Sequence, residues 1–144
     1  MDAMKIDEQK FLERLQTMGL GTDWRWDKGS WWRDAGEDFD LRDYTGCMLA
    51  ARARFVAITA TELQSKEIQL DYQWDLDGQL LSLRSATIQQ TIASITDLCP
   101  AADWVERETR EYFAVVFTGR ETTDPLMMRA NSEPGLHLRK EVAQ

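Results

Sequence analysis

The stretch Ser94-Ile-Thr-Asp-Leu-Cys-Pro-Ala-Ala-Asp-Trp-Val-Glu-Arg-Glu-Thr-Arg-Glu-Tyr-Phe-Ala-Val-Val-Phe117 predicts a polar turn, then a helix, then a strand. Pro100 suits the first helical turn, because the N–H that proline lacks would have no partner there. Asp103 places a negative charge near the positive end of the helix dipole. The helix is therefore expected to begin near Pro100 and to lead into a β-branched strand.

The predicted helix has one face on which residues recur at steps of three and four. That face holds Ala101, Trp104, Val105, Glu108, Tyr112 and Phe113. Glu108 is the one charged member, so we expect a partly buried carboxylate that needs a partner or a shifted pKa. The opposite, solvated face is expected to hold Glu106, Arg107, Arg110 and Glu111. Its i,i+4 pairs, Glu106 with Arg110 and Arg107 with Glu111, are each worth ~0.2–0.5 kcal/mol at most.

This region resembles the thirty-kilodalton subunit of NADH–quinone oxidoreductase, respiratory complex I, and its relatives in energy-converting NiFe hydrogenases. The resemblance rests on Ser-Ile-Thr-Asp-Leu-x-Pro-Ala-Ala-Asp-Trp-x-Glu-Arg-Glu, then Tyr112-Phe113, Gly119 and Leu138-Arg139-Lys140. It is close from Ser94 to Gly119, thinner to Lys140, and visible only in outline before Ser94. The most specific residues of the motif are Trp104, Glu106, Arg107 and Glu108.

The chain also departs from the usual family pattern. Phe113-Ala114-Val115 stands where the family usually has Phe-Gly-Ile, and Gly119-Arg120-Glu121 stands where it has Gly-His-Pro. His137 replaces a proline before the leucine of the last motif. Together with the short chain, these departures favour the hydrogenase branch of the family.

The resemblance implies a noncatalytic, hydrophilic subunit that scaffolds a large catalytic subunit during electron transfer. The implied partners are a large subunit, of the 49 kDa or NiFe-hydrogenase type, and an iron–sulfur subunit. Iron–sulfur clusters and a NiFe centre or a quinone would be held by those partners, and the membrane would be reached only through them. The implied location is the cytoplasm, peripheral to the inner face of the cell membrane. An alternative from the residues is a small-molecule enzyme with Glu108 as general acid or base in a cleft near Trp104 and Tyr112.

Composition bounds the remaining possibilities. The chain has 144 residues, 43% of them hydrophobic, which suits one well-buried core. A net charge of −8 disfavours nucleic acid, whose binding needs clustered Lys and Arg. Cys47 and Cys99 indicate reduced thiols, and with the single His137 they cannot make a Cys₂His₂ zinc site or a Cys₄ cluster site. We expect no cofactor, no metal and no catalytic residue in this chain, and no apolar run reaches the roughly 18 residues of a membrane span.

The N-terminal part predicts a helix and an aromatic turn. An amphipathic helix is expected from Lys5 to Met18, with Asp7 as a possible cap, lying on a sheet. Four tryptophans then bracket a turn at residues 27–29: Trp24, Trp26, Trp31 and Trp32. Such rings are common at interface hot spots. Burial in the chain's own core is the commoner fate of large apolar rings, and we favour it.

The middle of the chain predicts a helix and three strands. A helix is expected from an N-cap at Asp40, followed by a strand over residues 54–61. Residues 68–76 alternate apolar and polar before Asp77-Gly78, a type I′ turn pair. Counting from that turn pairs Leu76 with Gln79, Trp74 with Leu81, Tyr72 with Leu83, Leu70 with Ser85, and Asp71 with Arg84. No secondary structure is assigned to residues 87–93.

These elements predict a two-layer α+β fold, with helices packed on one face of a mixed or antiparallel sheet. Residues 1–121 should form a single domain, and residues 122–144 a C-terminal extension that docks on a partner subunit. The extension's candidate contacts are Leu126, Met127, Met128, Leu138, Arg139 and Lys140. Arg139 or Lys140 could also fold back to pair with Glu108.

Overall fold

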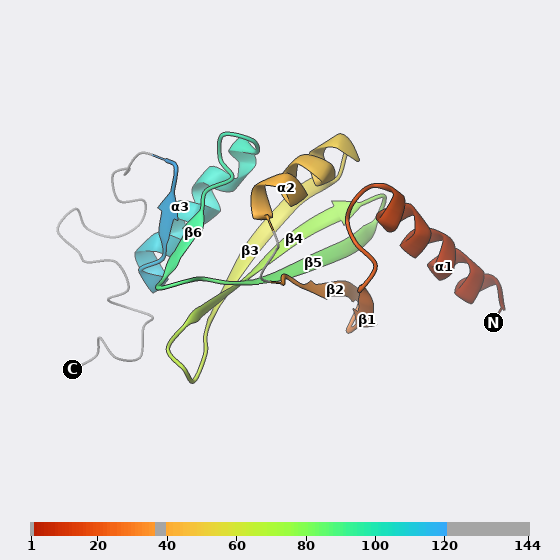
Figure 1. The fold of residues 1–144 in the computed structure, drawn as a ribbon, viewed down its shortest axis with the longest axis horizontal. Coiled ribbons are helices and arrows are strands. Elements are labelled where there is room, and N and C mark those ends of the chain that lie inside the picture. Colours follow the sequence, from red (N-terminus) through yellow and green to blue (C-terminus); the bar gives the residue numbers. More distant parts are fainter. Residues whose placement is uncertain (1, 37–39, 121–144) are drawn as a thin grey trace.

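A computed structural model of the chain describes residues 2–36 and 40–120 (Figure 1). Its elements, in chain order, are α1 (Asp2–Thr17), β1 (Arg25–Asp27), β2 (Ser30–Asp34), α2 (Leu41–Ala50), β3 (Arg54–Glu62), β4 (Ile68–Leu76), β5 (Gln79–Ala86), β6 (Thr91–Ala93), the 3₁₀ turn η1 (Pro100–Ala102), α3 (Asp103–Phe113) and β7 (Val116–Thr118).

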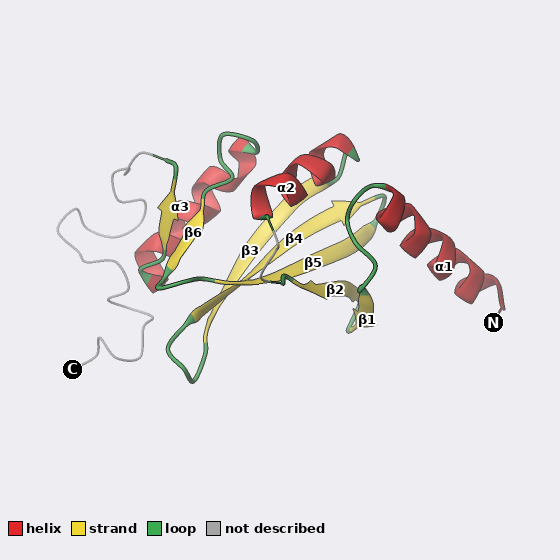
Figure 2. Cartoon of the chain, viewed as in Figure 1, coloured by secondary structure: helices red, strands yellow, loops and turns green. Residues whose placement is uncertain are grey.

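Five strands form a mixed sheet in the order β1-β2-β5-β4-β3, with β2 and β5 parallel and the other neighbours antiparallel. A second, two-stranded sheet pairs β6 with β7 in parallel. Helices α2 and α3 lie over the same side of the five-stranded sheet (Figure 2). The predicted α+β class and the mixed sheet are thus confirmed.

The hairpin of β4 and β5 has the predicted register, with Trp74 opposite Leu81 and Asp71 opposite Arg84. Asp77 and Gly78 both have positive φ, 51° and 85°, as a type I′ turn requires. Every second residue of this hairpin points into the core, where Trp74 and Leu81 are fully buried. The alternation in the sequence therefore set the register, because a slip by one residue would turn these side chains out to water.

The tryptophan stretch forms a second hairpin, β1 with β2, around a turn at Lys28 and Gly29. Its second strand then pairs in parallel with β5, with Trp31 opposite Leu81. This parallel pairing was not predicted, since parallel neighbours are joined by a long crossover and leave no local turn signal.

Helix α1 begins at Asp2, so the predicted start at Lys5 with an Asp7 cap was wrong. Asp7 lies inside the helix, where an acid is tolerated in the first turns. The C-terminal half of α1 joins the core through Leu15, which is fully buried, and through Phe11, whose ring centroid is 5.9 Å from that of Trp31. Arg14 forms an ion pair with Asp77 in the β4–β5 turn.

Helix α2 has the predicted cap. The Asp40 carboxylate accepts the backbone N–H groups of Arg42, at 2.9 Å, and of Asp43, at 3.2 Å. Tyr44 and Met48 face the core. The strand predicted after this helix is β3, which has an irregular register between Phe55 and Ala57. No helix in the described part of the chain combines the length and the apolar composition of a membrane span.

Candidate functional site

Helix α3 carries the motif residues and packs on the sheet with a different face from the predicted one. Residues at steps of four and three, Ala102, Glu106 and Thr109, are buried, whereas Trp104 is 56% exposed. Glu108 is half-buried. The expectation that Glu106 and Glu111 lie on a solvated face was wrong, because both carboxylates are almost fully buried. The apolar residues of this short helix led to the wrong prediction of its buried face, because a large ring such as that of Trp104 can remain at the surface.

The Glu106 side chain is fully buried and sits at the centre of a hydrogen-bond cluster. Its Oε1 accepts from Ser94 Oγ at 2.7 Å and from Arg120 Nη1 at 3.2 Å. Its Oε2 accepts the backbone N–H of Ile95 at 2.9 Å. A buried carboxylate is tolerated only when charged or hydrogen-bonding partners replace water, and here three donors do so. We call this set, Ser94, Ile95, Glu106 and Arg120, the Glu106 clamp.

Arg120 is the cation of the Glu106 clamp, with its side chain 14% exposed. It also donates to the Asp103 carboxylate at the start of α3. Asp103 lies in turn 3.9 Å from Arg107 Nη1. The clamp therefore joins the segment before α3, the helix itself and Arg120, the second residue after β7.

The loop before α3 is also tied to α2. Arg42 donates through both terminal nitrogens to the Asp97 carboxylate, each at 2.7 Å, and to the Ser94 carbonyl at 2.8 Å. This hydrogen bonding holds the pKa of Asp97 below its ordinary value of 3.8. The Glu106 clamp and the Arg42–Asp97 pair thus hold the same short loop from two sides.

Burial raises the pKa of the Tyr72 hydroxyl above its ordinary range, and the negative charge of Glu106 raises it further. Burial also raises the pKa of the Cys99 thiol, which disfavours the reactive thiolate form. Among residues 2–36 and 40–120, no three His, Cys, Asp or Glu side chains gather as a metal site.

The predicted partner-contact tryptophans divide between core and surface. Trp24 and Trp31 are 6% and 5% exposed, as the favoured interpretation expected. The Trp32 ring is half-buried under the Arg84 guanidinium, 4.9 Å from the ring centroid. Of the four, Trp26 alone is broadly exposed, at 52%. The candidates of the extension, Leu126, Met127, Met128, Leu138, Arg139 and Lys140, lie outside the described residues.

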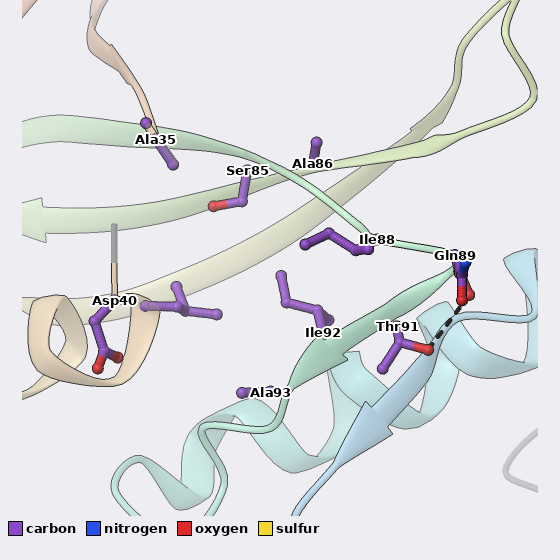
Figure 3. Close-up of a pocket in the computed structure, with 11 residues that line it drawn as sticks. Ala35, Asp40, Ser85, Ala86, Ile88, Gln89, Thr91, Ile92 and Ala93 are labelled. Carbon is purple, nitrogen blue, oxygen red and sulfur yellow. Dashed lines mark hydrogen bonds between the residues drawn. The ribbon is translucent and has the colours of Figure 1, made fainter. Parts of the chain in front are cut away.

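An open pocket of about 990 Å³ lies between the start of α2, the end of β5 and β6. We call it the β5–β6 groove, and it is lined by Ala35, Gly36, Asp40, Leu41, Ser85, Ala86, Ile88, Gln89, Thr91, Ile92 and Ala93. Figure 3 shows Ile88 and Ile92 close together in its middle, with Ser85 entering from β5. Glu108, the alternative catalyst, is not among the lining residues.

Sequence reasoning missed the two side-chain partners of Glu106. Ser94 opens the Ser-Ile-Thr motif, and a hydroxyl at the start of such a motif was an available signal. No local sequence pattern predicts Arg120 as a partner of Glu106, because β7 and a turn separate Arg120 from α3. The pairing of β7 with β6 places Arg120 beside Glu106.

A family described as the 30 kDa subunit of the respiratory-chain NADH dehydrogenase matches residues 41–144. The chain is 42% identical over 52 residues to the C subunit of the NADH-quinone oxidoreductase of Roseiflexus castenholzii, an alignment that covers 36% of this chain and 29% of that protein. It is 30% identical over 76 residues to the corresponding protein of Rhodopseudomonas palustris, covering 47% of this chain and 38% of that protein. These matches span less than half the length of either relative.

Two solved structures share the fold. One is a chain of the membrane-bound sulfane sulfur reductase, an archaeal respiratory membrane complex, with a TM-score of 0.72, 18% identity, and coverage of 91% of this chain and 82% of that chain. The other is a trypsin-resistant fragment of Nqo5, with a TM-score of 0.61, 17% identity, and coverage of 80% and 98%. At these identities the likeness concerns the fold.

Proposed function

Because the chain belongs to the family of the 30 kDa subunit of the respiratory-chain NADH dehydrogenase, we propose that it is a noncatalytic subunit that scaffolds the large subunit of a membrane-associated redox complex. The match over residues 41–144 carries this proposal, since it covers most of the domain and all of the extension. The packing role of the most specific motif supports it. Glu106 uses its carboxylate to hold three parts of its own chain together.

The partners we propose are a large subunit, of the 49 kDa or NiFe-hydrogenase type, and an iron–sulfur subunit. The contacts would come from the extension, from residue 122 onward, and from exposed rings on the domain. Trp104 supports this, because it belongs to the specific motif yet is 56% exposed, which is unusual for a ring of this size. Trp26, at 52%, is the second such ring.

The clusters and the NiFe centre or quinone would be held by these partner chains. This chain has two cysteines, of which Cys99 is buried and Cys47 half-buried. Cluster ligation needs several thiolates aimed at one point. The chain's part in electron transfer would therefore be to hold the redox subunits in place.

The hydrogenase branch is our proposal for the parent complex, and it rests on the departures around residue 120. The family's usual Gly-His-Pro is here Gly119-Arg120-Glu121, and Arg120 serves as the cation of the Glu106 clamp. Residue 120 thus has a packing partner within the chain. We place the subunit on the cytoplasmic face of the membrane, attached through its partners.

Co-purification tests the proposal. A chain that ends at residue 121 should fold, as judged by circular dichroism, but should no longer co-purify with the large subunit. Trp104→Ala in the full chain should weaken the same association. Leu49→Ala is the matched control, because Leu49 is 38% exposed on α2 and is not a predicted contact. Retention of the large subunit by the shortened chain at the level of the full chain would contradict the proposal.

A further inference from the structure

The β5–β6 groove has an apolar wall that the described residues leave open. Ile88 is 79% exposed, the most of any large apolar side chain described, and Ile92 lies beside it (Figure 3). Exposing a large apolar side chain to water is unfavourable, and a segment that covered it would recover that free energy. This wall is therefore suited to an apolar segment.

The backbone that presents Ile88 is constrained. Ile88 and Thr91 exchange backbone hydrogen bonds of 2.9 Å and 3.1 Å around Gln89 and Gln90. Both glutamines have positive φ, 50° and 62°, a conformation that is unfavourable for non-glycine residues. Strained backbone conformations of this kind cluster at binding sites and active sites.

Ser85 lines the same groove, and its hydroxyl oxygen is buried beneath the surface. Ser85 is 5% exposed, and its Oγ has no hydrogen-bond partner among the described residues. A buried hydroxyl without a partner is unfavourable, because it has lost its hydrogen bonds to water. If the Ser85 side chain turned toward the groove, a backbone group of a docked segment would supply the missing hydrogen bond, which an apolar side chain alone would not.

Strand β7, the last described element of the chain, pairs with β6, which lines this groove. Thr118 of β7 pairs with Ala93, a lining residue, and its carbonyl accepts the N–H of Ser94 at 2.8 Å. The described part of the chain therefore ends at Arg120, two residues after the partner of Ala93, and paired strands lie about 4.8 Å apart. Leu126 follows Arg120 by only six residues, which can span about 20 Å when extended.

We propose that the apolar triad Leu126-Met127-Met128 of the extension lies in the β5–β6 groove when the chain is free of partners. The triad is the first apolar group after Arg120. Methionine side chains adapt to irregular apolar surfaces, which suits the wall formed by Ile88 and Ile92. The inference goes beyond the proposed function, because it concerns the free chain and leaves residues 136–140 available to a partner.

Proteolysis of the unmodified chain tests the proposal. Trypsin cleaves after Arg129, next to the triad, and after Arg139, farther along the extension. Relative to a synthetic peptide of residues 121–144, cleavage after Arg129 should be slowed about tenfold more than cleavage after Arg139, because a docked site must open first. Met127→Asp should abolish this difference. Equal slowing at both sites in the unmodified chain would overturn the proposal.

Disulfide formation identifies the occupant. In a Cys47→Ser background, Ile88→Cys with Met127→Cys should form an intramolecular disulfide about tenfold faster than Val56→Cys with Met127→Cys. Val56 is 42% exposed on β3 and does not line the groove, so it is the matched control. Equal rates for the two pairs would overturn the proposal. A disulfide formed mainly between two molecules would overturn it as well, because a second copy would then fill the groove.

Discussion

Glu106→Gln removes the negative charge at the centre of the Glu106 clamp while keeping the size of the side chain. Arg120 would keep Asp103 as a partner, so its charge would not be left uncompensated. The glutamine amide would however direct an NH₂ group at one of the three donors that now reach the carboxylate. Hydrogen bonds to charged groups are worth about 1.5–3 kcal/mol each, and breaking a buried pair costs about 3–5 kcal/mol. We expect a loss of about 3 kcal/mol in the free energy of unfolding.

Urea denaturation of the full chain, followed by tryptophan fluorescence, measures this loss. With an m-value of about 2 kcal/mol/M, the midpoint should fall by about 1.5 M. Glu108→Gln is the matched control, on the same helix and only half-buried, and should change the free energy of unfolding by no more than about 0.5 kcal/mol. The contrast between the two glutamates tests the helix phase directly.

A double-mutant cycle separates the ion pair from general packing. Glu106→Gln and Arg120→Ala, singly and together, should show a coupling energy of at least about 1 kcal/mol, because Arg120 Nη1 lies 3.2 Å from Glu106 Oε1. Coupling below about 0.5 kcal/mol, or equal losses for Glu106→Gln and Glu108→Gln, would refute the assignment of Glu106 as the anchor.

Three further changes test other parts of the fold. Leu81→Ala opposite Trp74 should cost about 3 kcal/mol in urea denaturation, because both side chains are fully buried and a cavity would remain. Gly78→Ala should lower the free energy of unfolding by about 1 kcal/mol through backbone strain alone, since φ is 85° and no atom lies within 4 Å of the added methyl group. A more stable protein would contradict the type I′ turn. Arg42→Ala should flatten the acid side of the stability profile. The pKa of Asp97 is lowered in the folded chain, so its pairing with Arg42 stabilises the fold above pH 3.8, and this stabilisation is lost as the pH falls through the lowered pKa. If the unmodified chain and Arg42→Ala lost stability identically in acid, the Arg42–Asp97 pair would not contribute to the pH dependence.

The sequence was sufficient wherever the signal was local. Alternation along residues 68–76 and the pair Asp77-Gly78 determined the β4–β5 register, because side-chain period and turn type leave one register that buries the apolar face. Asp40 as a cap of α2 followed from its side chain and the helical spacing after it. The motif from Ser94 also indicated the family, which the match over residues 41–144 shows.

The tertiary structure decided which carboxylate of α3 is buried. Periodicity pointed to Glu108 beside Trp104, since an apolar neighbour is the only local sign of burial. Burial of a charge depends instead on donors that replace water, and those of Glu106 come from Ser94, Ile95 and Arg120. Arg120 is placed beside Glu106 by the pairing of β7 with β6, which no local pattern in the sequence encodes. The sequence by itself determined the strands, the turns and the family, whereas only the folded chain determined the polar centre, because its partners are distant in sequence and meet through packing.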